Sequence, residues 1–204
     1  MGLAAERLAD RAAIDALLVA AFPTPAEADL VHALRTSGAL ATSLVADHDG
    51  AVVGHVAFSP ITVDGQTAPA SGLAPVAVAP GHQRRGIAAA LIEAGIAARR
   101  AAGDGLVVVL GDPAYHGRFG FRPARELGLV DTYEGGDAFQ ALALRDGWRA
   151  DPGARRVVRY AAAFDTLPAH PLPEGVAPPL AMICLLYTSP SPRDISGSRM
   201  PSSA

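Results

Sequence analysis

The chain has 204 residues, of which 50% are hydrophobic, so one domain with a sizeable core is the default. A net charge of -3 and a pI near 6.0 argue against a dedicated nucleic-acid binder and give no support for binding to anionic membranes. The single cysteine, Cys184, excludes an intrachain disulfide and a cysteine-based zinc site, and the histidines lack metal-ligand spacing. No apolar run reaches the roughly 18 residues of a membrane span, and no signal peptide is evident, so we expect a cytoplasmic protein without a bound metal.

Two helices are predicted at the start of the chain. Apolar side chains recur at helical spacing over residues 10–22, and Pro23 ends that pattern. Thr24 is a predicted N-cap, and Glu27 three residues later completes a capping box. A second helix should therefore begin directly after the first.

Strand patterns follow. Residues 47–50 predict a hairpin turn, with Gly50 available for positive φ, and Pro60 predicts a break in the next strand. The predicted strands are residues 43–46, 51–58, 61–63, 73–78, 106–110, 138–144 and 156–164. Because a long Ala-rich helix connects residues 73–78 with residues 106–110, these two strands should be parallel. The element order predicts an α+β fold, with one mixed sheet and helices on its faces.

The turn between residues 78 and 88 carries the strongest functional signal. It leads from a strand into a helix predicted from Arg84 to about Ala102, whose first N–H groups lack intrahelical acceptors. Gly86 allows close backbone approach, and Arg84 and Arg85 add positive charge. These features indicate a site for an anion of diphosphate size. The alternative is an ordinary surface helix start with two solvated arginines.

The pattern Gln83-x-x-Gly86-x-Ala88 resembles the acetyl-CoA signature of the GNAT N-acetyltransferases. The amino-acid sequences of residues 54–60 and 110–121 are similar to those of the YhbS-like branch of that superfamily. The resemblance covers roughly residues 10–165. It implies a mostly antiparallel mixed sheet with helices on both faces. Two splayed central parallel strands would hold the pantetheine arm of the coenzyme between them.

The resemblance also implies which residues hold acetyl-CoA as co-substrate. The backbone of Val76 and Val78 would pair with the pantetheine amides, as an added strand does. The diphosphate would lie against main-chain N–H groups of the signature segment. The residues implied in cofactor binding are Val76, Val78, Gln83, Arg84, Arg85, Gly86, Ile87 and Ala88.

The candidate catalytic residues follow the strand at residues 106–110. In the resembled family a tyrosine four residues before a Gly-Phe pair often faces the coenzyme sulfur. Here the pair is Gly120-Phe121, and that position is His116, with Tyr115 as its neighbour. We expect His116 to protonate the departing sulfur, with Tyr115 as the reserve candidate. The alternative is that His116 is a turn residue and Tyr115 a packing residue.

No general base is evident. His55 lies within an apolar strand, and Glu27 and His32 lie on the opening helices. Each has a simpler interpretation: His55 is hydrogen-bonded within the sheet, Glu27 belongs to the capping box, and His32 faces solvent.

Acetyl transfer from acetyl-CoA to a primary amine of a small molecule or peptide, by direct attack, is the leading functional hypothesis. A non-catalytic acyl-CoA-binding regulatory module is the alternative, and a homodimer is possible. Residues 1–165 would form the domain, 166–182 a Pro-rich segment, and 183–204 a tail that resembles translated sequencing-adapter sequence. Family members usually begin with a short strand, but residues 1–9 show no strand alternation. Either the predicted start is wrong or this edge strand is absent.

Overall fold

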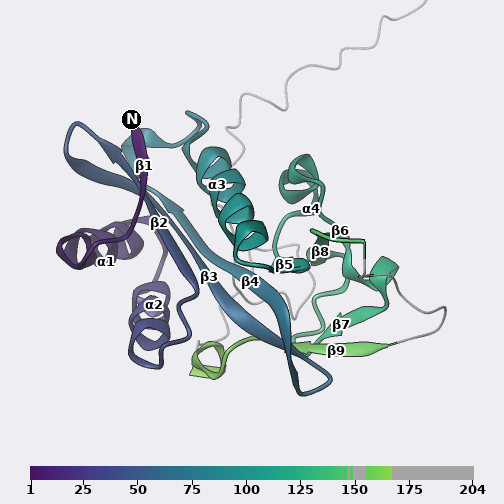
Figure 1. Ribbon diagram of the computed structural model, residues 1–204. Helices are drawn as coiled ribbons and strands as arrows, with labels where there is room; N and C mark the ends of the chain where they lie inside the picture. Colours follow the sequence, from purple (N-terminus) through teal and green to yellow (C-terminus); the bar gives the residue numbers. More distant parts are fainter. Residues whose placement is uncertain (147, 149–154, 167–204) are drawn as a thin grey trace, which may run out of the picture.

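The computed structural model describes residues 1–146, 148 and 155–166, and within these residues nine strands form one sheet (Figure 1). The strands are β1 (Gly2–Ala5), β2 (Thr42–His48), β3 (Ala51–Val63), β4 (Gln66–Val78), β5 (Leu106–Leu110), β6 (Arg122–Pro123), β7 (Leu129–Asp131), β8 (Phe139–Ala143) and β9 (Arg156–Arg159). The α-helices are α1 (Arg11–Ala21), α2 (Ala26–Thr36), α3 (Ile87–Ala101) and α4 (Pro113–His116).

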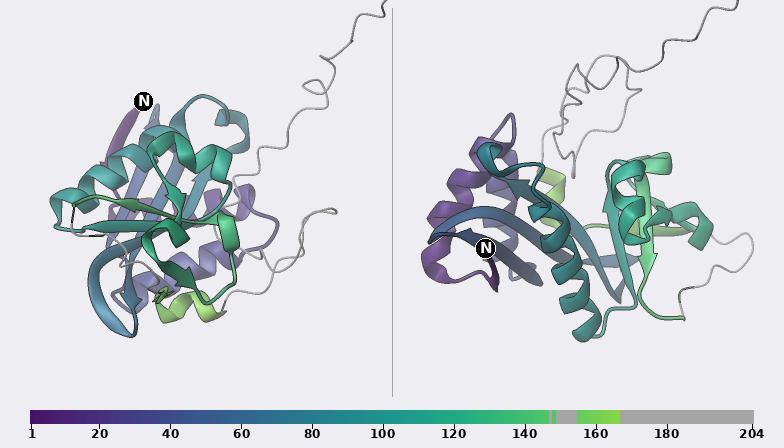
Figure 2. Two further views of the ribbon diagram at one scale, coloured as in Figure 1. Left: turned by 90° about the vertical axis from the view of Figure 1, so that its right-hand side faces the viewer. Right: turned by 90° about the horizontal axis from the view of Figure 1, so that it is seen from above.

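The main path through the sheet is β1-β2-β3-β4-β5-β8-β6, and β9 pairs with both β3 and β7. Neighbouring strands are antiparallel except in the pairs β4–β5 and β7–β9. Helices α1 and α2 cover one face, and α3 covers the other (Figures 1 and 2). The expected α+β fold with a mixed, mostly antiparallel sheet is therefore confirmed.

The central parallel strands diverge. Strand β4 pairs with β5 only over Ala70–Gly72, opposite Leu106–Val108. Beyond that point β4 continues to Val78 and pairs with β3 alone. Within the part of the chain that the structure describes, the edge of β4 that faces β5 thus has no strand partner over its last residues, which confirms the expected splay.

Helix α3 packs closely on the sheet because its inner face is apolar or small. Leu91 and Ile92 are fully buried there. At Gly95 an added Cβ atom would lie 2.1 Å from Cε2 of Phe58, so only glycine allows this approach. The packing fixes the start of α3 relative to β4, and that start forms part of the site described below.

The chain begins with an edge strand, β1, although the sequence of residues 1–9 shows no strand pattern. Gly2–Ala5 pairs with β2 in antiparallel register, so the edge strand is present. All four of its residues are exposed, which explains why the sequence shows no alternation. Its stability comes from backbone hydrogen bonds to a strand some forty residues away, continued by the N–H of Glu6 to the carbonyl of Ser43 at 3.0 Å.

Two local predictions are wrong. Pro60 does not end its strand: β3 continues through it to Val63, and the register shifts between Pro60 and Thr62, where an irregular ladder tolerates a missing donor. No capping box forms at α2, because the N-cap is Pro25 and the Thr24 hydroxyl accepts only from the N–H of Ala26, at 3.4 Å. Glu27 is buried instead.

Three element boundaries also differ from expectation. Strand β4 begins at Gln66 rather than at residue 73, because the residues before Leu73 also pair with β3. Helix α3 begins at Ile87 rather than Arg84, because Gly86 and Arg84 both have positive φ. Strand β9 ends at Arg159, and a 3-10 helix follows over Ala162–Thr166. The described part of the chain contains no helix with the length and apolar character needed to cross a bilayer. Residues 167–182 of the Pro-rich segment and the tail 183–204 lie outside the described residues.

Candidate functional site

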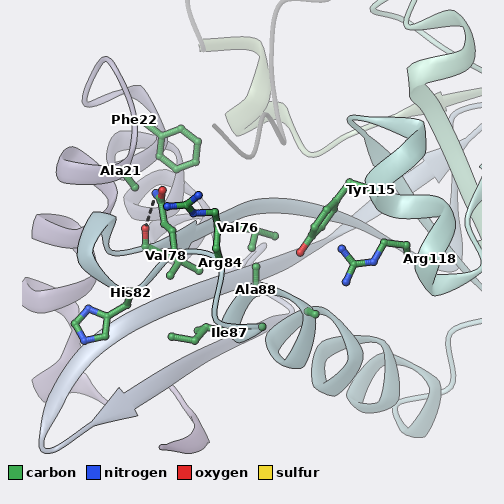
Figure 3. Close-up of a pocket in the computed structure, with 13 residues that line it drawn as sticks. Ala21, Phe22, Val76, Val78, His82, Arg84, Ile87, Ala88, Tyr115 and Arg118 are labelled. Atoms are coloured by element: carbon green, nitrogen blue, oxygen red, sulfur yellow. Dashed lines mark hydrogen bonds between the residues drawn. The ribbon is translucent and has the colours of Figure 1, made fainter. Parts of the chain in front are cut away.

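A cavity of about 320 Å³ lies beside the free edge of β4 (Figure 3). The start of α3, helix α4 and the connection between α1 and α2 complete its walls. Its lining residues are Ala21, Phe22, Val76, Val78, His82, Gln83, Arg84, Gly86, Ile87, Ala88, Ala89, Tyr115 and Arg118. Its basic lining residues are His82, Arg84 and Arg118, and none of the described lining residues carries a carboxylate. The cavity therefore favours an anionic ligand.

The turn into α3 has the geometry of an anion-binding site. Arg84 has φ 59° and Gly86 has φ 79°, so the backbone turns twice through the left-handed region before the helix begins. The side-chain amide of Gln83 donates to the carbonyl of Val78 at 3.2 Å and holds the turn against β4. An added Cβ at Gly86 would have no atom within 4 Å, so the space before the turn is open. The first residues of α3, Ile87, Ala88 and Ala89, line the cavity, and the N–H groups of a first helical turn, which lack intrahelical acceptors, suit a phosphate.

Most of the residues predicted to bind the cofactor come together here. Seven line the cavity: Val76, Val78, Gln83, Arg84, Gly86, Ile87 and Ala88. Arg85 does not line it and is exposed. The two valines lie on the part of β4 that has lost β5, and the others lie on the turn or the first turn of α3. A single ligand in the cavity would therefore meet both groups.

Tyr115 and His116 are neighbours on α4 but occupy different environments. Tyr115 lines the cavity, and its ring lies beneath the Arg118 guanidinium, 5.0 Å from ring centroid to Cζ. His116 is 0% exposed and packs edge-on against the rings of Tyr115 and Phe121, at centroid distances of 5.4 and 5.7 Å. Tyr115, the reserve candidate, therefore lines the cavity, whereas His116, the first candidate, does not.

The surroundings of His116 keep it neutral. Neither ring nitrogen has a hydrogen-bond partner among the described residues. Burial lowers the pKa of His116 to about 4, and the nearby carboxylate of Asp112 opposes this only in part. A histidine that is uncharged at neutral pH and enclosed by aromatic rings is poorly placed to deliver a proton to a ligand in the cavity. Its role at the sulfur stays a prediction.

The three candidate bases lie away from the cavity lining. His55 is fully buried in β3, its Nε2 lies 2.8 Å from the Ser43 hydroxyl, and desolvation lowers its pKa to about 4. Glu27 is buried at the start of α2, and His32 is exposed. His55 thus fits its simpler interpretation as a hydrogen-bonded histidine within the sheet.

Arg118 and Phe22 also line the cavity, and neither was predicted from the sequence. Arg118 follows Tyr115 by three residues, about one helical turn, and this spacing predicts a shared side. Phe22 lies in the short connection between α1 and α2, and no local pattern indicates that it reaches a turn some sixty residues away.

The chain is similar to known proteins in sequence and in fold. Residues 7–124 match the sequence family described as an acetyltransferase (GNAT) domain. The chain is 41% identical over 158 residues to YhbS, an uncharacterized N-acetyltransferase of Escherichia coli (strain K12), and the match covers 76% of this chain and 93% of YhbS.

Two solved structures are similar in fold and sequence. The crystal structure of the GNAT family N-acetyltransferase YhbS from Escherichia coli, in complex with CoA, superposes with a TM-score of 0.76 at 39% identity, covering 80% of this chain and 91% of that chain. The crystal structure of a GNAT family acetyltransferase from Brucella melitensis, in complex with acetyl-CoA, gives a TM-score of 0.67 at 38% identity, covering 80% of this chain and 97% of that chain. Since the family match spans more than half of the chain and YhbS is covered almost completely, the chain belongs to the GNAT family of N-acetyltransferases.

Proposed function

We propose that this protein transfers an acetyl group from acetyl-CoA to a primary amine of a small molecule or peptide. The observation that carries the proposal is the cavity itself, which joins a phosphate-sized turn to the unpaired edge of β4. A nucleotide alone would use the turn but not the strand edge. The complexes of similar proteins with CoA and acetyl-CoA support the same ligand here.

In this proposal the main chain does most of the cofactor binding. The diphosphate lies against the N–H groups of residues 84–88, at the positive end of α3. The pantetheine arm runs beside Val76 and Val78 as an additional strand, because β5 no longer occupies that edge. Such contacts depend on backbone shape, which explains why Ile87 and Ala88 serve as well as polar residues.

The chemistry is a direct attack of the neutral amine on the thioester carbonyl. A backbone N–H of β4 stabilises the negative charge that develops on the carbonyl oxygen. Coenzyme A then leaves as a thiolate, and the phenol of Tyr115, which lines the cavity, donates a proton to the sulfur. The described lining residues include no Cys, Ser or Lys, and direct attack requires no acyl-enzyme. The amine loses its proton through water.

A thiol-release assay over a panel of primary amines, run alongside calorimetry with acetyl-CoA, tests the function. Turnover with at least one amine supports the proposal. Binding of acetyl-CoA without turnover of any amine contradicts it and favours the regulatory module.

A pair of variants tests the residue assignment. Tyr115→Phe should lower kcat by roughly 100-fold, with acetyl-CoA affinity nearly unchanged, because only the proton donor is lost. His116→Phe, its matched control on the same helix, should keep most of the wild-type rate. The opposite outcome would return the role to His116.

A further inference from the structure

Among the described residues, the guanidinium of Arg118, at the Tyr115 end of the cavity, has no carboxylate partner. Its Cζ atom lies 5.0 Å from the centroid of the Tyr115 ring and 5.8 Å from that of Phe119. None of the ion pairs within the described residues includes it. The next arginine along the chain, Arg122, is instead paired with Glu126 at 2.7 Å. The charge of Arg118 is thus held over two aromatic rings and left available to the cavity.

The two arginines that line the cavity, Arg84 and Arg118, lie at different ends of it. Arg84 belongs to the turn before α3, where main-chain N–H groups already suit a diphosphate. Figure 3 shows Arg118 on the other side of Tyr115, with its guanidinium directed toward the hydroxyl end of that ring. If the sulfur lies at Tyr115, the guanidinium lies close to where the leaving group acquires its charge.

We propose that Arg118 is a catalytic residue that stabilises the coenzyme A thiolate as it departs. This proposal rests on the proposed function, which places the sulfur beside Tyr115. When the tetrahedral intermediate collapses, the C–S bond breaks and its electron pair remains on sulfur. The guanidinium offers fixed positive charge to that sulfur and cannot itself give up a proton. Tyr115 then protonates the thiolate, and solvent restores the phenol proton while taking up the proton lost by the amine.

Arg118→Met, Arg118→Lys and the control Arg122→Met test this by steady-state kinetics. Removing the charge should lower kcat about tenfold, equivalent to about 1.4 kcal/mol, and leave the KM for acetyl-CoA within about twofold. Lysine keeps the charge but loses the planar stacking, so it should recover part of the rate. Arg122→Met should behave as wild type, because Arg122 lies outside the cavity lining.

A phosphate contact would give a different result. If Arg118 bound the 3′-phosphate of the cofactor, Arg118→Met would raise the KM for acetyl-CoA and leave the kinetics with acetyl-3′-dephospho-CoA unchanged. That result overturns the proposal. An equal fall in kcat with both thioesters supports it.

A binding measurement separates this proposal from the proposed function. A nearby cation lowers the pKa of a bound thiol below its ordinary value, about 8.5 for a cysteine thiol, so the affinity for free coenzyme A should rise as pH increases toward that value. Calorimetry should show this rise in the wild type and a weaker one in Arg118→Met. His82 also lines the cavity, but it is present in both proteins. Equal pH dependence in the two proteins overturns the thiolate role, even if no amine is ever acetylated.

Discussion

Replacing His116 by phenylalanine should make the protein more resistant to acid. The imidazole is fully buried among aromatic rings, and both of its nitrogens lack hydrogen-bond partners among the described residues. Phenylalanine has a similar shape and removes two unsatisfied polar atoms, so we expect the free energy of unfolding at pH 7 to be unchanged or slightly higher. The larger effect should appear below pH 6.5.

The sign and size follow from the pKa. Burial lowers the pKa of His116 from 6.5 to about 4, so between these values the unfolded chain binds a proton that the folded protein does not. Stability is therefore fully present above about pH 6.5 and falls as pH decreases toward 4. For this shift in pKa, the free energy of unfolding at pH 5 is about 2 kcal/mol lower than at high pH, and at pH 7 it is roughly 0.2 kcal/mol lower. His55, with a similar shift, contributes a loss of the same order. In His116→Phe, only the loss of stability caused by His55 should remain.

Urea unfolding at pH 7, 6 and 5 measures this difference. Wild type and Tyr115→Phe, which keeps His116, should lose stability together, and His116→Phe should lose about half as much. At pH 5 a difference of about 2 kcal/mol corresponds to roughly 4–8 °C in Tm for a domain of this size. Parallel curves for all three proteins would refute the reasoning, because they would show that His116 is solvated or charged in the folded state.

Two further predictions concern glycines. Gly86→Glu should weaken acetyl-CoA binding by roughly 100-fold or more in calorimetry, because it places negative charge at the phosphate turn. Gly38→Glu, which puts the same side chain at another positive-φ position outside the cavity, should bind normally, and equal binding by both would contradict the turn assignment. Gly95→Ala should cost about 1–3 kcal/mol in urea unfolding, because its Cβ would lie 2.1 Å from the Phe58 ring. An unchanged midpoint would mean that α3 moves away from the sheet without cost.

Local pattern was sufficient for much of the fold. The central strand at Leu106–Leu110 was predicted at its observed bounds, and the hairpin turn at residues 47–50 lies where the Asp-Gly pattern places it. Two of the failures share one cause. Strand β1 and the passage of β3 through Pro60 depend on backbone pairing with strands elsewhere in the chain, and that pairing leaves no periodic signal in their own side chains.

In the candidate site, too, some features follow from local sequence and others from the packing of distant elements. The turn at Gln83–Ala88 was recognisable because its requirements are local: a glycine with positive φ, a helix start and positive charge within six residues. The sequence by itself therefore determined the fold class and the position of the turn that leads into α3. Only the tertiary structure decided that Tyr115 rather than His116 lines the cavity, and that Arg118 accompanies it. The side of a short helix that faces a cavity is set by how the helix docks on distant strands, and this cannot be read from the identity of two adjacent residues.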